Sequence, residues 1–422
     1  MAALIVRGAV RVPGDKSISH RALILASLAA GSGRVRGVLD AADVRSTAGV
    51  LRALGAEVPE LSQDFVVTGR GLRSLRPADE SLDCGNSGTT ARLVAGVAAA
   101  HPFASRFVGD ASLSRRPMRR VAGPLAAMGA RIDLAPAGTL PMTIEGGDLV
   151  GLEWATEAAS AQVKSAILLA GLVAGVDVTV REPERSRDHT ERMLAARGAD
   201  VGVTDGVVTL RPRGPLPAGD VAVPADPSSA AFLAAFAALA DGGEVELPDV
   251  CLNPTRTGFL RALARMGARV SIGGERDEAG EIVGTVCVAP AGLRAIAVEG
   301  GEVPSLIDEL PLLACIAARA EGETVIRGAS ELRVKESDRI AAVVSNLRAI
   351  GAAAAELPDG LRVAGGAGPL RGQVRTFGDH RIAMAFGVLG ALPGNEIRVD
   401  DRACVGVSYP AFWRDLNRLA SA

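Results

Sequence analysis

Three lysines stand out in this chain of 422 residues: Lys16, Lys164 and Lys335. Lysine and arginine together number 46, so arginine supplies nearly all of the positive charge. A general compositional bias towards arginine accounts for that imbalance, but it does not account for the three exceptions. Lysine carries a compact ammonium that can lose its proton, whereas the guanidinium stays charged. We therefore expect the three lysines to mark a site that binds anions or transfers protons.

Short polar segments precede runs of small apolar residues along the whole chain. The segments contain Ser, Asn or Asp, which favour the N-cap position of a helix. The runs that follow them, such as residues 230–240, are apolar on nearly all sides, which predicts buried helices. A helix N-terminus exposes unpaired N–H groups and about half a positive charge, so it attracts anions. The predicted helix starts are residues 16–19, 86–89, 160–162, 226–229, 308–311 and 379–381.

Cationic and amide side chains gather at these starts, for example Lys16 and Arg21 at the first and Gln162 and Lys164 at the third. Ordinary caps with cations extended into solvent would explain any one of them. Five such starts together favour a binding site for a phosphorylated ligand, because arginine forks and lysine point charges both bind phosphate.

A dense run of mixed charges at residues 333–339 predicts the start of another helix. Lys335 and Arg339 would lie one turn apart on it, and like charges at that spacing repel each other. An anion between them would remove the repulsion. This run therefore also favours a ligand with phosphate or carboxylate groups.

Another pattern, Leu-x-x-x-Gly-Ala, recurs with its glycines 74, 69, 69 and 84 residues apart. Each copy ends a helical pattern and precedes a short apolar segment, which predicts a glycine C-cap between an outer helix and a strand. The predicted repeat is strand, buried helix, strand, outer helix and two strands. A sixth outer helix is expected near residues 409–419. The five copies lie at residues 51–56, 125–130, 194–199, 263–268 and 347–352.

The repeats predict an α/β fold with two similar domains, because three repeats make a domain of ordinary size. The N-terminal segments 4–7 and 9–12 would supply the strands that the last repeat lacks. Domain I is then expected to comprise residues 1–13 and 226–422, and domain II residues 14–225. Proline and glycine occur at both crossings, as sharp turns between domains require.

The composition argues against several classes of function. A net charge of -2 and an aromatic content of 3% speak against a nucleic-acid partner. The five cysteines form no paired motif and the four histidines occur singly, which argues against disulfides and a metal site. The chain shows neither a signal peptide nor an apolar run of membrane-spanning length, so a cytoplasmic enzyme is expected. The usual motifs for acyl transfer, ATP hydrolysis and hydride transfer are missing as well.

Several motifs together resemble one enzyme family. In this order along the whole chain, they are similar to the 3-phosphoshikimate 1-carboxyvinyltransferases, also called EPSP synthases. The resemblance implies a two-domain inside-out α/β barrel in which each domain holds three βαβαββ repeats with buried helices. The motifs lie at residues 13–21 (PGDKSISHR), 85–89 (GNSGT), 116–118 (RPM), 160–162 (SAQ), 333–339 (RVKESDR) and 378–381 (GDHR).

The resemblance also implies a reaction. The enolpyruvyl group of phosphoenolpyruvate moves to the 5-hydroxyl of shikimate 3-phosphate by addition and then elimination, in a cleft between the domains, and phosphate is released. The product belongs to the shikimate pathway, which leads to chorismate and the aromatic amino acids. The implied enzyme is a cytoplasmic monomer with two small-molecule substrates and no cofactor, metal, nucleic-acid or membrane partner.

Matching positions imply the residues of the site. Asp308 would take the proton of the hydroxyl, and Glu336 and Lys16 are further candidates for proton transfer. Additional candidates are Asn86, Lys164 and His380. The set implied for shikimate 3-phosphate is Lys16, Ser17, Arg21, Ser160, Ala161, Gln162, Ser186, Asp308 and Lys335. The set implied for phosphoenolpyruvate is Lys16, Gly88, Arg116, Gln162, Arg339 and Arg381.

The chain departs from the family pattern at several positions. Ala161, His189 and Glu331 stand where some members have serine, tyrosine and asparagine. Val407 occupies a position where many members place a lysine that contacts phosphoenolpyruvate. Either Lys164 compensates for that lysine, which we favour, or the site has one cation fewer.

Two alternative functions stay open at this point. A sister enzyme transfers enolpyruvyl to a UDP-amino sugar on the same fold, but it usually carries a reactive cysteine in the second repeat, and residues 109–118 contain none. The other alternative is an RNA-binding module built from similar repeats. The acidic pI of about 6.2 and the scarcity of aromatic residues speak against RNA binding.

Overall fold

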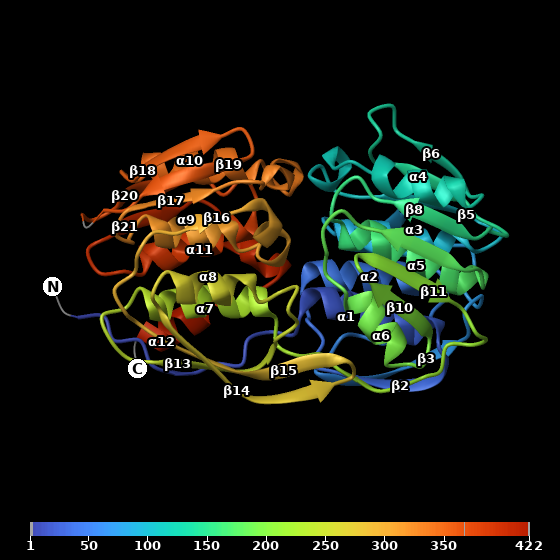
Figure 1. Ribbon diagram of the computed structural model, residues 1–422. Helices are drawn as coiled ribbons and strands as arrows, with labels where there is room; N and C mark the ends of the chain where they lie inside the picture. The colour runs from blue at the N-terminus through green and yellow to red at the C-terminus, as the bar shows by residue number, and fades with distance from the viewer. Residues whose placement is uncertain (1–2, 367, 421–422) are drawn as a thin grey trace. The chain divides into compact units, whose positions relative to one another are not determined.

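Helices made almost wholly of small apolar residues occupy the centres of two compact units (Figure 1). The computed structural model describes residues 3–366 and 368–420. Unit 1 contains Met1–Pro13, Pro224–Arg276 and Ile282–Ala422, and unit 2 contains Gly14–Val223 together with Asp277–Glu281.

Unit 2 alternates helices and short strands. Its helices are α1 Lys16–Leu28, α2 Ala42–Ala53, α3 Gly88–Ala99, η1 Leu113–Arg115, α4 Arg119–Ala127, α5 Ala161–Ala174 and α6 His189–Ala195. Its strands are β2 Ala30–Arg36, β3 Asp64–Arg70, β4 Leu82–Asp83, β5 Ala104–Val108, β6 Arg131–Leu134, β7 Met142–Glu145, β8 Leu152–Ala155, β9 Val178–Arg181, β10 Asp200–Thr204, β11 Val207–Arg211 and β12 Val221–Ala222.

Unit 1 alternates in the same way. Its helices are α7 Pro227–Ala238, α8 Gly258–Arg265, η2 Gly300–Ser305, α9 Leu310–Ala317, η3 Ser330–Val334, α10 Arg339–Ala349, α11 His380–Gly390, η4 Ala403–Val407 and α12 Phe412–Ala420. Its strands are β1 Gly8–Ala9, β13 Val245–Cys251, β14 Arg269–Glu278, β15 Glu281–Ala289, β16 Ala297–Val298, β17 Glu323–Ile326, β18 Ala353–Leu357, β19 Gly360–Ala364, β20 Arg371–Val374 and β21 Glu396–Val399.

The sheets repeat one strand order. The orders β4-β5-β7-β6, β8-β9-β11-β10 and β16-β17-β19-β18 are equivalent. The first two strands of each sheet run parallel and are joined by a buried helix, namely α3, α5 or α9. Parallel neighbours need such a crossover, because a tight hairpin can only reverse the chain. The predicted βαβαββ repeat is confirmed in these sheets.

Two further sheets borrow their first strand from elsewhere in the chain. β1 precedes α1 but pairs in parallel with β13, and β12 precedes α7 but pairs in parallel with β2. The expectation that segments 4–7 and 9–12 supply strands to the last repeat is therefore wrong. The strand is confined to Gly8–Ala9 and lies in the sheet of the fourth repeat, whereas the last repeat pairs β20 with β21.

The N-terminal segment does contact the last helix. The Nη2 of Arg418 in α12 donates to Ala9 O at 2.6 Å, and the N–H of Arg7 donates to Leu419 O at 3.4 Å. The repeat pattern correctly associates the chain ends, but it cannot show which sheet edge is open to the strand. That choice depends on which unpaired backbone groups lie within reach.

The predicted buried helices are confirmed. Every residue of α7 is buried. Helix α3 packs along α5 so closely that a Cβ at Gly96 would lie 2.2 Å from Ala166 O, so this position requires glycine. Although these helices are apolar, none in the described part of the chain is long and apolar enough to cross a membrane.

The glycine C-caps predicted from the Leu-x-x-x-Gly-Ala pattern are confirmed. All five glycines have positive φ, between 79° and 114°. In each copy the alanine N–H donates to the leucine carbonyl, at distances of 2.8 to 3.2 Å. The glycine N–H donates to the carbonyl three residues earlier. This pair of bonds is the Schellman motif, which ends a helix and satisfies its last carbonyls.

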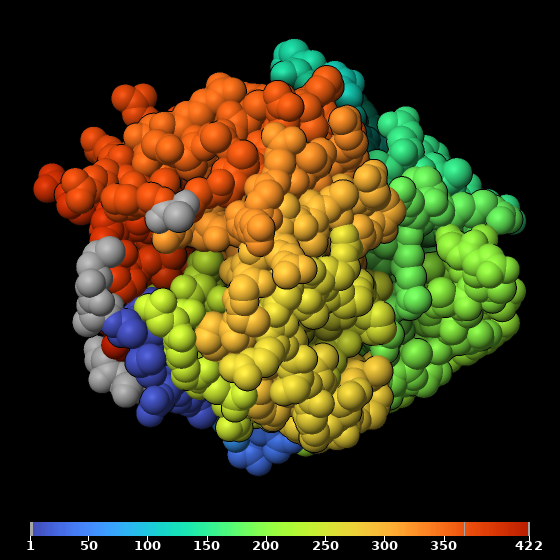
Figure 2. Space-filling model, turned by 60° about the vertical axis from the view of Figure 1, so that its left-hand side comes forward, coloured from blue at the N-terminus to red at the C-terminus, as the bar shows by residue number. Residues whose placement is uncertain are grey.

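The sequence patterns do not predict the β14–β15 hairpin. Most β14 side chains are exposed, on the face of unit 1 that appears yellow in Figure 2. The tip, Asp277–Glu281, belongs to unit 2. There Glu281 Oε1 lies 2.7 Å from Nδ1 of the buried His189.

The Schellman geometry predicts opposite effects for two Gly→Ala substitutions in unit 2. Gly198 follows α6 with a φ of 79°, and no atom would crowd a Cβ there, so Gly198→Ala tests backbone strain alone. We expect a loss of about 1 kcal/mol of unfolding free energy. Gly49 lies inside α2 with equally open surroundings, and Gly49→Ala should stabilise by about 0.5–1 kcal/mol. Denaturant titrations would measure both, and a stabilised Gly198→Ala variant would contradict the left-handed cap.

Candidate active site

About half of the predicted site residues lie in the first turns of the buried helices, and several others lie just before a helix. In α1, α3, α5, α7 and α11 the side chain of the N-cap residue accepts a hydrogen bond from a backbone N–H of the first turn. These N-cap residues are Asp15, Ser87, Ser160, Asp226 and Asp379. The predicted polar helix starts are confirmed at these positions. The start of α9 differs, because Glu309 occupies its N-cap without a side-chain cap bond.

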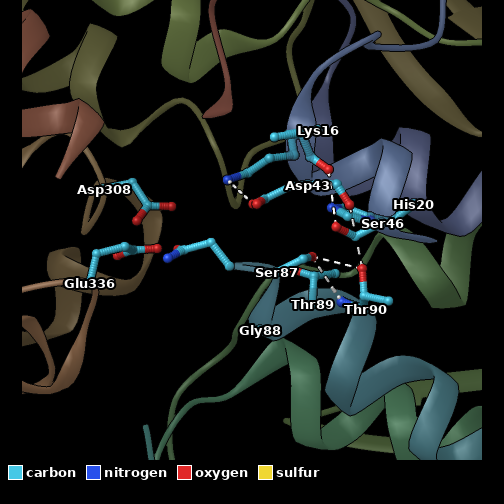
Figure 3. A network of polar contacts seen from close by, with 12 residues as sticks. Lys16, His20, Asp43, Ser46, Ser87, Gly88, Thr89, Thr90, Asp308 and Glu336 are labelled. Atoms are coloured by element: carbon cyan, nitrogen blue, oxygen red, sulfur yellow. Dashed lines mark hydrogen bonds and ion pairs between the residues drawn. The ribbon is translucent and has the colours of Figure 1, made fainter. Parts of the chain in front are cut away.

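Lys16 pairs with an acidic residue that is not among the predicted site residues. Its Nζ lies 3.0 Å from Oδ2 of Asp43, in the first turn of α2 (Figure 3). The two side chains are 16% and 8% exposed, so the ammonium is shielded but within reach of a ligand. The only signal for Asp43 was its acidic type at a helix start. The two partners are 27 residues apart in the sequence, so no local pattern predicts that they pair.

A buried chain of hydroxyl groups lies behind this ion pair (Figure 3). His20 Nδ1 lies 2.6 Å from Thr47 Oγ1, which lies 2.6 Å from Thr90 Oγ1. Thr90 donates in turn to Ser87 Oγ at 2.7 Å. Burial lowers the pKa of His20 well below its ordinary value, and the nearby Lys16 lowers it further. The neutral imidazole and the hydroxyl groups therefore join α1, α2 and α3 without adding charge.

Arg21 is held in place by three acceptors. Its Nε donates to Thr190 Oγ1 at 2.7 Å, its Nη2 to Ser165 Oγ at 2.7 Å and its Nη1 to Ser17 O at 2.9 Å. Burial lowers the pKa of the guanidinium to about 10, although Glu191 raises it. Arg21 therefore stays charged at neutral pH, and it brings the start of α1 together with α5 and α6.

A second group of predicted residues surrounds the start of α3. Arg116 donates from Nη2 to Asn86 Oδ1 at 2.6 Å and from Nη1 to Asn86 O at 3.2 Å. Arg92 donates from Nη1 to Gln162 Oε1 at 2.7 Å. A Cβ at Gly88 would lie 2.6 Å from Arg92 Nη1. Arg92 was not among the predicted site residues. The only sequence feature that points to it is its position one helical turn after Gly88.

Lys164 does not lie at a ligand-accessible position. Its Nζ lies 2.6 Å from Glu182 Oε2 and 2.7 Å from Glu191 Oε1, and its side chain is 1% exposed. Val407 ends η4 in unit 1 and is half-buried. The hypothesis that Lys164 compensates for the lysine missing at Val407 is therefore wrong, because two protein carboxylates already surround the ammonium. Ser186 is buried next to Glu182 and donates its hydroxyl to it.

In unit 1, Arg339 is enclosed by carboxylates. Its Nε lies 2.8 Å from Asp379 Oδ2, its Nη2 2.7 Å from Glu336 Oε2 and its Nη1 3.2 Å from Asp308 Oδ1. The side chain is 1% exposed. Burial alone would lower the pKa of this guanidinium, but Asp379, Glu336 and Asp308 together raise it above its ordinary value. Asp308 and Glu336 thus lie next to each other, as Figure 3 also shows.

The predicted repulsion between Lys335 and Arg339 on one helix is wrong. Helix α10 begins at Arg339, with Asp338 as its N-cap, and Lys335 lies before it, at the end of η3. The two cations are therefore not one helical turn apart. Three protein carboxylates, those of Asp308, Glu336 and Asp379, pair with Arg339.

Arg381 lies in the first turn of α11 and also contacts Asp308. Its Nη2 lies 3.3 Å from Asp308 Oδ2, and its Nη1 lies 3.5 Å from Glu309 Oε1. His380 is buried at the first position of the same helix. Asp308 is thus a carboxylate between two guanidinium groups, and Lys335 is half-buried in the segment before α10.

Each unit thus offers a distinct chemistry. Unit 2 presents cations, hydroxyls and an amide at helix N-termini, which suits phosphate and carboxylate groups. Unit 1 presents carboxylates that arginines hold in place, and carboxylates can accept or donate protons. The predicted residues of unit 2 are Lys16, Ser17, Arg21, Asn86, Gly88, Arg116, Ser160, Ala161, Gln162 and Ser186, and those of unit 1 are Asp308, Lys335, Glu336, Arg339, His380 and Arg381.

Similarity to known proteins extends along the chain. A model of the EPSP synthase (3-phosphoshikimate 1-carboxyvinyltransferase) family matches residues 4–416. A 3-phosphoshikimate 1-carboxyvinyltransferase of Sulfurihydrogenibium sp. strain YO3AOP1 is 50% identical over 420 residues, which cover 98% of this chain and 97% of the relative. One of Xanthomonas euvesicatoria is 48% identical over 410 residues, which cover 96% and 93%.

Solved structures agree with the fold. An EPSP synthase from Acinetobacter baumannii has a TM-score of 0.88 and 40% identity, covering 99% of this chain and 96% of that one. The enolpyruvyl transferase NikO from Streptomyces tendae has a TM-score of 0.76 at 19% identity, covering 99% and 95%, and thus shares the fold. The predicted inside-out α/β fold class is confirmed. Because both the family model and close relatives match nearly the whole chain, this chain belongs to the EPSP synthase family of enzymes, the 3-phosphoshikimate 1-carboxyvinyltransferases.

Proposed function

We propose that this chain transfers the enolpyruvyl group of phosphoenolpyruvate to the 5-hydroxyl of shikimate 3-phosphate and releases phosphate. The cluster around Gly88 carries the proposal, because Asn86 and Gln162 lie at the starts of α3 and α5 and the guanidinium of Arg116 contacts Asn86 there. Phosphate and carboxylate groups bind well at such helix N-termini. The relatives that match the whole chain are named for this reaction. The proposed enzyme acts in the shikimate pathway as a cytoplasmic monomer, with residues 1–13 and 226–422 as one domain and 14–225 as the other.

Shikimate 3-phosphate is the proposed ligand of the first turns of α1 and α5. Arg21 supports this assignment, because it stays charged and is held rigidly by Thr190 and Ser165. A preorganised cation loses little conformational entropy when a phosphate binds. The proposed contacts are Lys16, Ser17, Arg21, Ser160, Ala161, Gln162 and Ser186, with Asp308 and Lys335 from unit 1.

Phosphoenolpyruvate is the proposed ligand of the cluster around Gly88, together with Lys16. Arg339 and Arg381 of unit 1 are the proposed partners of its other anionic group. Arg339 is buried among carboxylates, so its contact with the substrate requires Asp308 or Glu336 to move. Arg381 is 8% exposed, donates to Asp308 O at 3.2 Å, and pairs with the carboxylates of Asp308 and Glu309 at 3.3 and 3.5 Å, so its ion pairs can change partners more readily.

The proposed chemistry needs groups that move protons. During addition, the hydroxyl oxygen bonds to C2 of phosphoenolpyruvate, Asp308 takes the hydroxyl proton, and Glu336 or Lys16 gives a proton to the methylene carbon. During elimination, that carbon loses a proton again, the C2–O bond to phosphate breaks, and the double bond re-forms. Asp308 suits the first role, because its carboxylate accepts bonds from Arg339 and Arg381 that keep it in place.

Both alternatives from the sequence are weaker than this proposal. Segment 109–118 lacks the cysteine expected of an enolpyruvyl transferase for UDP-amino sugars. The relatives that match the chain carry the shikimate name, and aromatic residues, which would stack on RNA bases, make up only 3% of the chain.

A direct assay tests the proposal. The protein is mixed with shikimate 3-phosphate and phosphoenolpyruvate, and free phosphate is measured over time. We expect phosphate release that requires both substrates. A UDP-amino sugar in place of shikimate 3-phosphate serves as the control and should give no release. A folded protein that releases no phosphate at saturating concentrations of both substrates would refute the assignment.

Arg116→Ala should lower kcat/KM by about 100-fold or more, because an aligned charged donor at a reacting anion contributes several kcal/mol. Arg116 is buried against Asn86, whereas its neighbour Arg115 is exposed. Arg115→Ala is therefore the matched control and should retain activity within about twofold. Steady-state kinetics with circular dichroism would separate the two variants. Equal losses in both would contradict the proposed contact.

Gly88→Ala should raise KM for phosphoenolpyruvate by about tenfold, because its Cβ would lie 2.6 Å from Arg92 Nη1 and displace the side chain that holds Gln162. KM for shikimate 3-phosphate should change much less. Gly123→Ala in α4 is a control, because its nearest atoms would be those of Trp154 at 3.8 Å. An unchanged KM for phosphoenolpyruvate in Gly88→Ala would contradict the proposed binding of phosphoenolpyruvate next to Gly88.

A further inference from the structure

Lys164 is a fully buried cation between two carboxylates. Its ammonium lies 2.6 Å from Glu182 and 2.7 Å from Glu191, and the three side chains are 1%, 2% and 3% exposed. They come from three different places: Lys164 from the first turns of α5, Glu182 from just after β9, and Glu191 from the first turn of α6. The ion cluster therefore joins elements that the backbone does not hold together locally.

Lys164 keeps its positive charge in the folded protein. Burial alone would lower the pKa of Lys164, but Glu191 and Glu182 together raise it above its ordinary value. Burial raises the pKa of Glu191, and Lys164 opposes that rise. Removing one member of such a cluster leaves an uncompensated charge in the interior, which is strongly unfavourable.

The two carboxylates stand at opposite ends of one segment, residues 182–191. Ser186 lies between them, donates its hydroxyl to Glu182 Oε1, and has its backbone N 3.5 Å from Glu182 Oε2. Thr190 lies next to Glu191, and its Oγ1 accepts a hydrogen bond from Nε of Arg21 at 2.7 Å. Lys164 thus ties the two ends of the segment that carries one proposed phosphate contact, Ser186, and supports another, Arg21.

We infer that Lys164 is a positioning residue for the shikimate 3-phosphate site, because its ammonium closes the segment 182–191 through Glu182 and Glu191 and fixes Ser186 and the Thr190–Arg21 contact. The inference rests on the proposed function for the identity of the ligand. It gives Lys164 no contact with substrate. It also explains the retention of lysine in a chain that uses arginine almost everywhere else, since a compact ammonium can serve two carboxylates in a closed space better than a planar fork.

The test replaces the ionic cluster without leaving a buried charge. Lys164→Met alone strands two carboxylates and can prevent folding, so the main variant is K164M/E182Q/E191Q, in which all three groups are neutral and similar in size. We expect this variant to fold and its KM for shikimate 3-phosphate to rise by about tenfold, since small misplacements of binding groups are costly. KM for phosphoenolpyruvate should stay within about twofold. Hydrogen exchange of amides in residues 182–191 should become faster.

Gly198→Ala is the matched control, because it destabilises the end of the same helix, α6, without touching the cluster. It should lose stability with an unchanged KM for both substrates. Ser186→Ala should raise KM for shikimate 3-phosphate in the wild-type background, and its effect should be smaller in the triple variant, since both changes act on one contact.

Each outcome separates the inference from the proposed function. Unchanged KM values in the triple variant, whatever its stability, would make Lys164 merely structural and overturn the inference. A rise in KM for phosphoenolpyruvate alone would also overturn it, because it would return Lys164 to the other substrate. A wild-type protein without turnover would instead refute the proposed function, and the inference about this ligand with it.

Discussion

A helix that is apolar on nearly all sides must be enclosed by other elements, and this constraint governs the rest of the structure. In α3, α5 and α7 the side chains are so small and apolar that only close packing in a core satisfies them. Strands and outer helices therefore surround them. Only the ends of such a helix can meet polar partners. The N-terminal ends carry unpaired N–H groups, which makes them natural positions for anion-binding side chains.

The positive charges that lie at the ends of the apolar core must be balanced by carboxylates. Lys16 is paired with Asp43, Arg339 with three carboxylates, and Lys164 with two. The degree of burial distinguishes them: Lys16 remains 16% exposed, whereas the other two are 1% exposed. A partly exposed pair can exchange its partner for a ligand at low cost, but a buried cluster resists change. Partner exchange is therefore easiest at Lys16, and rigidity is greatest at Lys164.

The repeats agree in how their outer helices end but differ in how their first strands pair. The Schellman caps recur in all five copies of the motif, because each outer helix must end before a strand that returns to the sheet. The first strand is less uniform. β1 and β12 do not pair within the repeats that follow them in sequence. β1 pairs with β13 and β12 pairs with β2, each in the sheet of a different repeat. The open edge of a sheet accepts any strand that can reach it with the right backbone direction, so sequence order does not decide the pairing.

The sequence by itself determined the repeat, the buried helices, their polar starts and the glycine caps, because these depend on patterns within about twenty residues. The family motifs also identified the candidate residues. Only the tertiary structure decided which side chains meet: Asp43 with Lys16, and Glu182 and Glu191 with Lys164. These partners come from different helices and loops, and no local pattern encodes such a contact. The rare lysines could be noticed in the sequence, but their separate roles depend on burial and on partners that folding brings together.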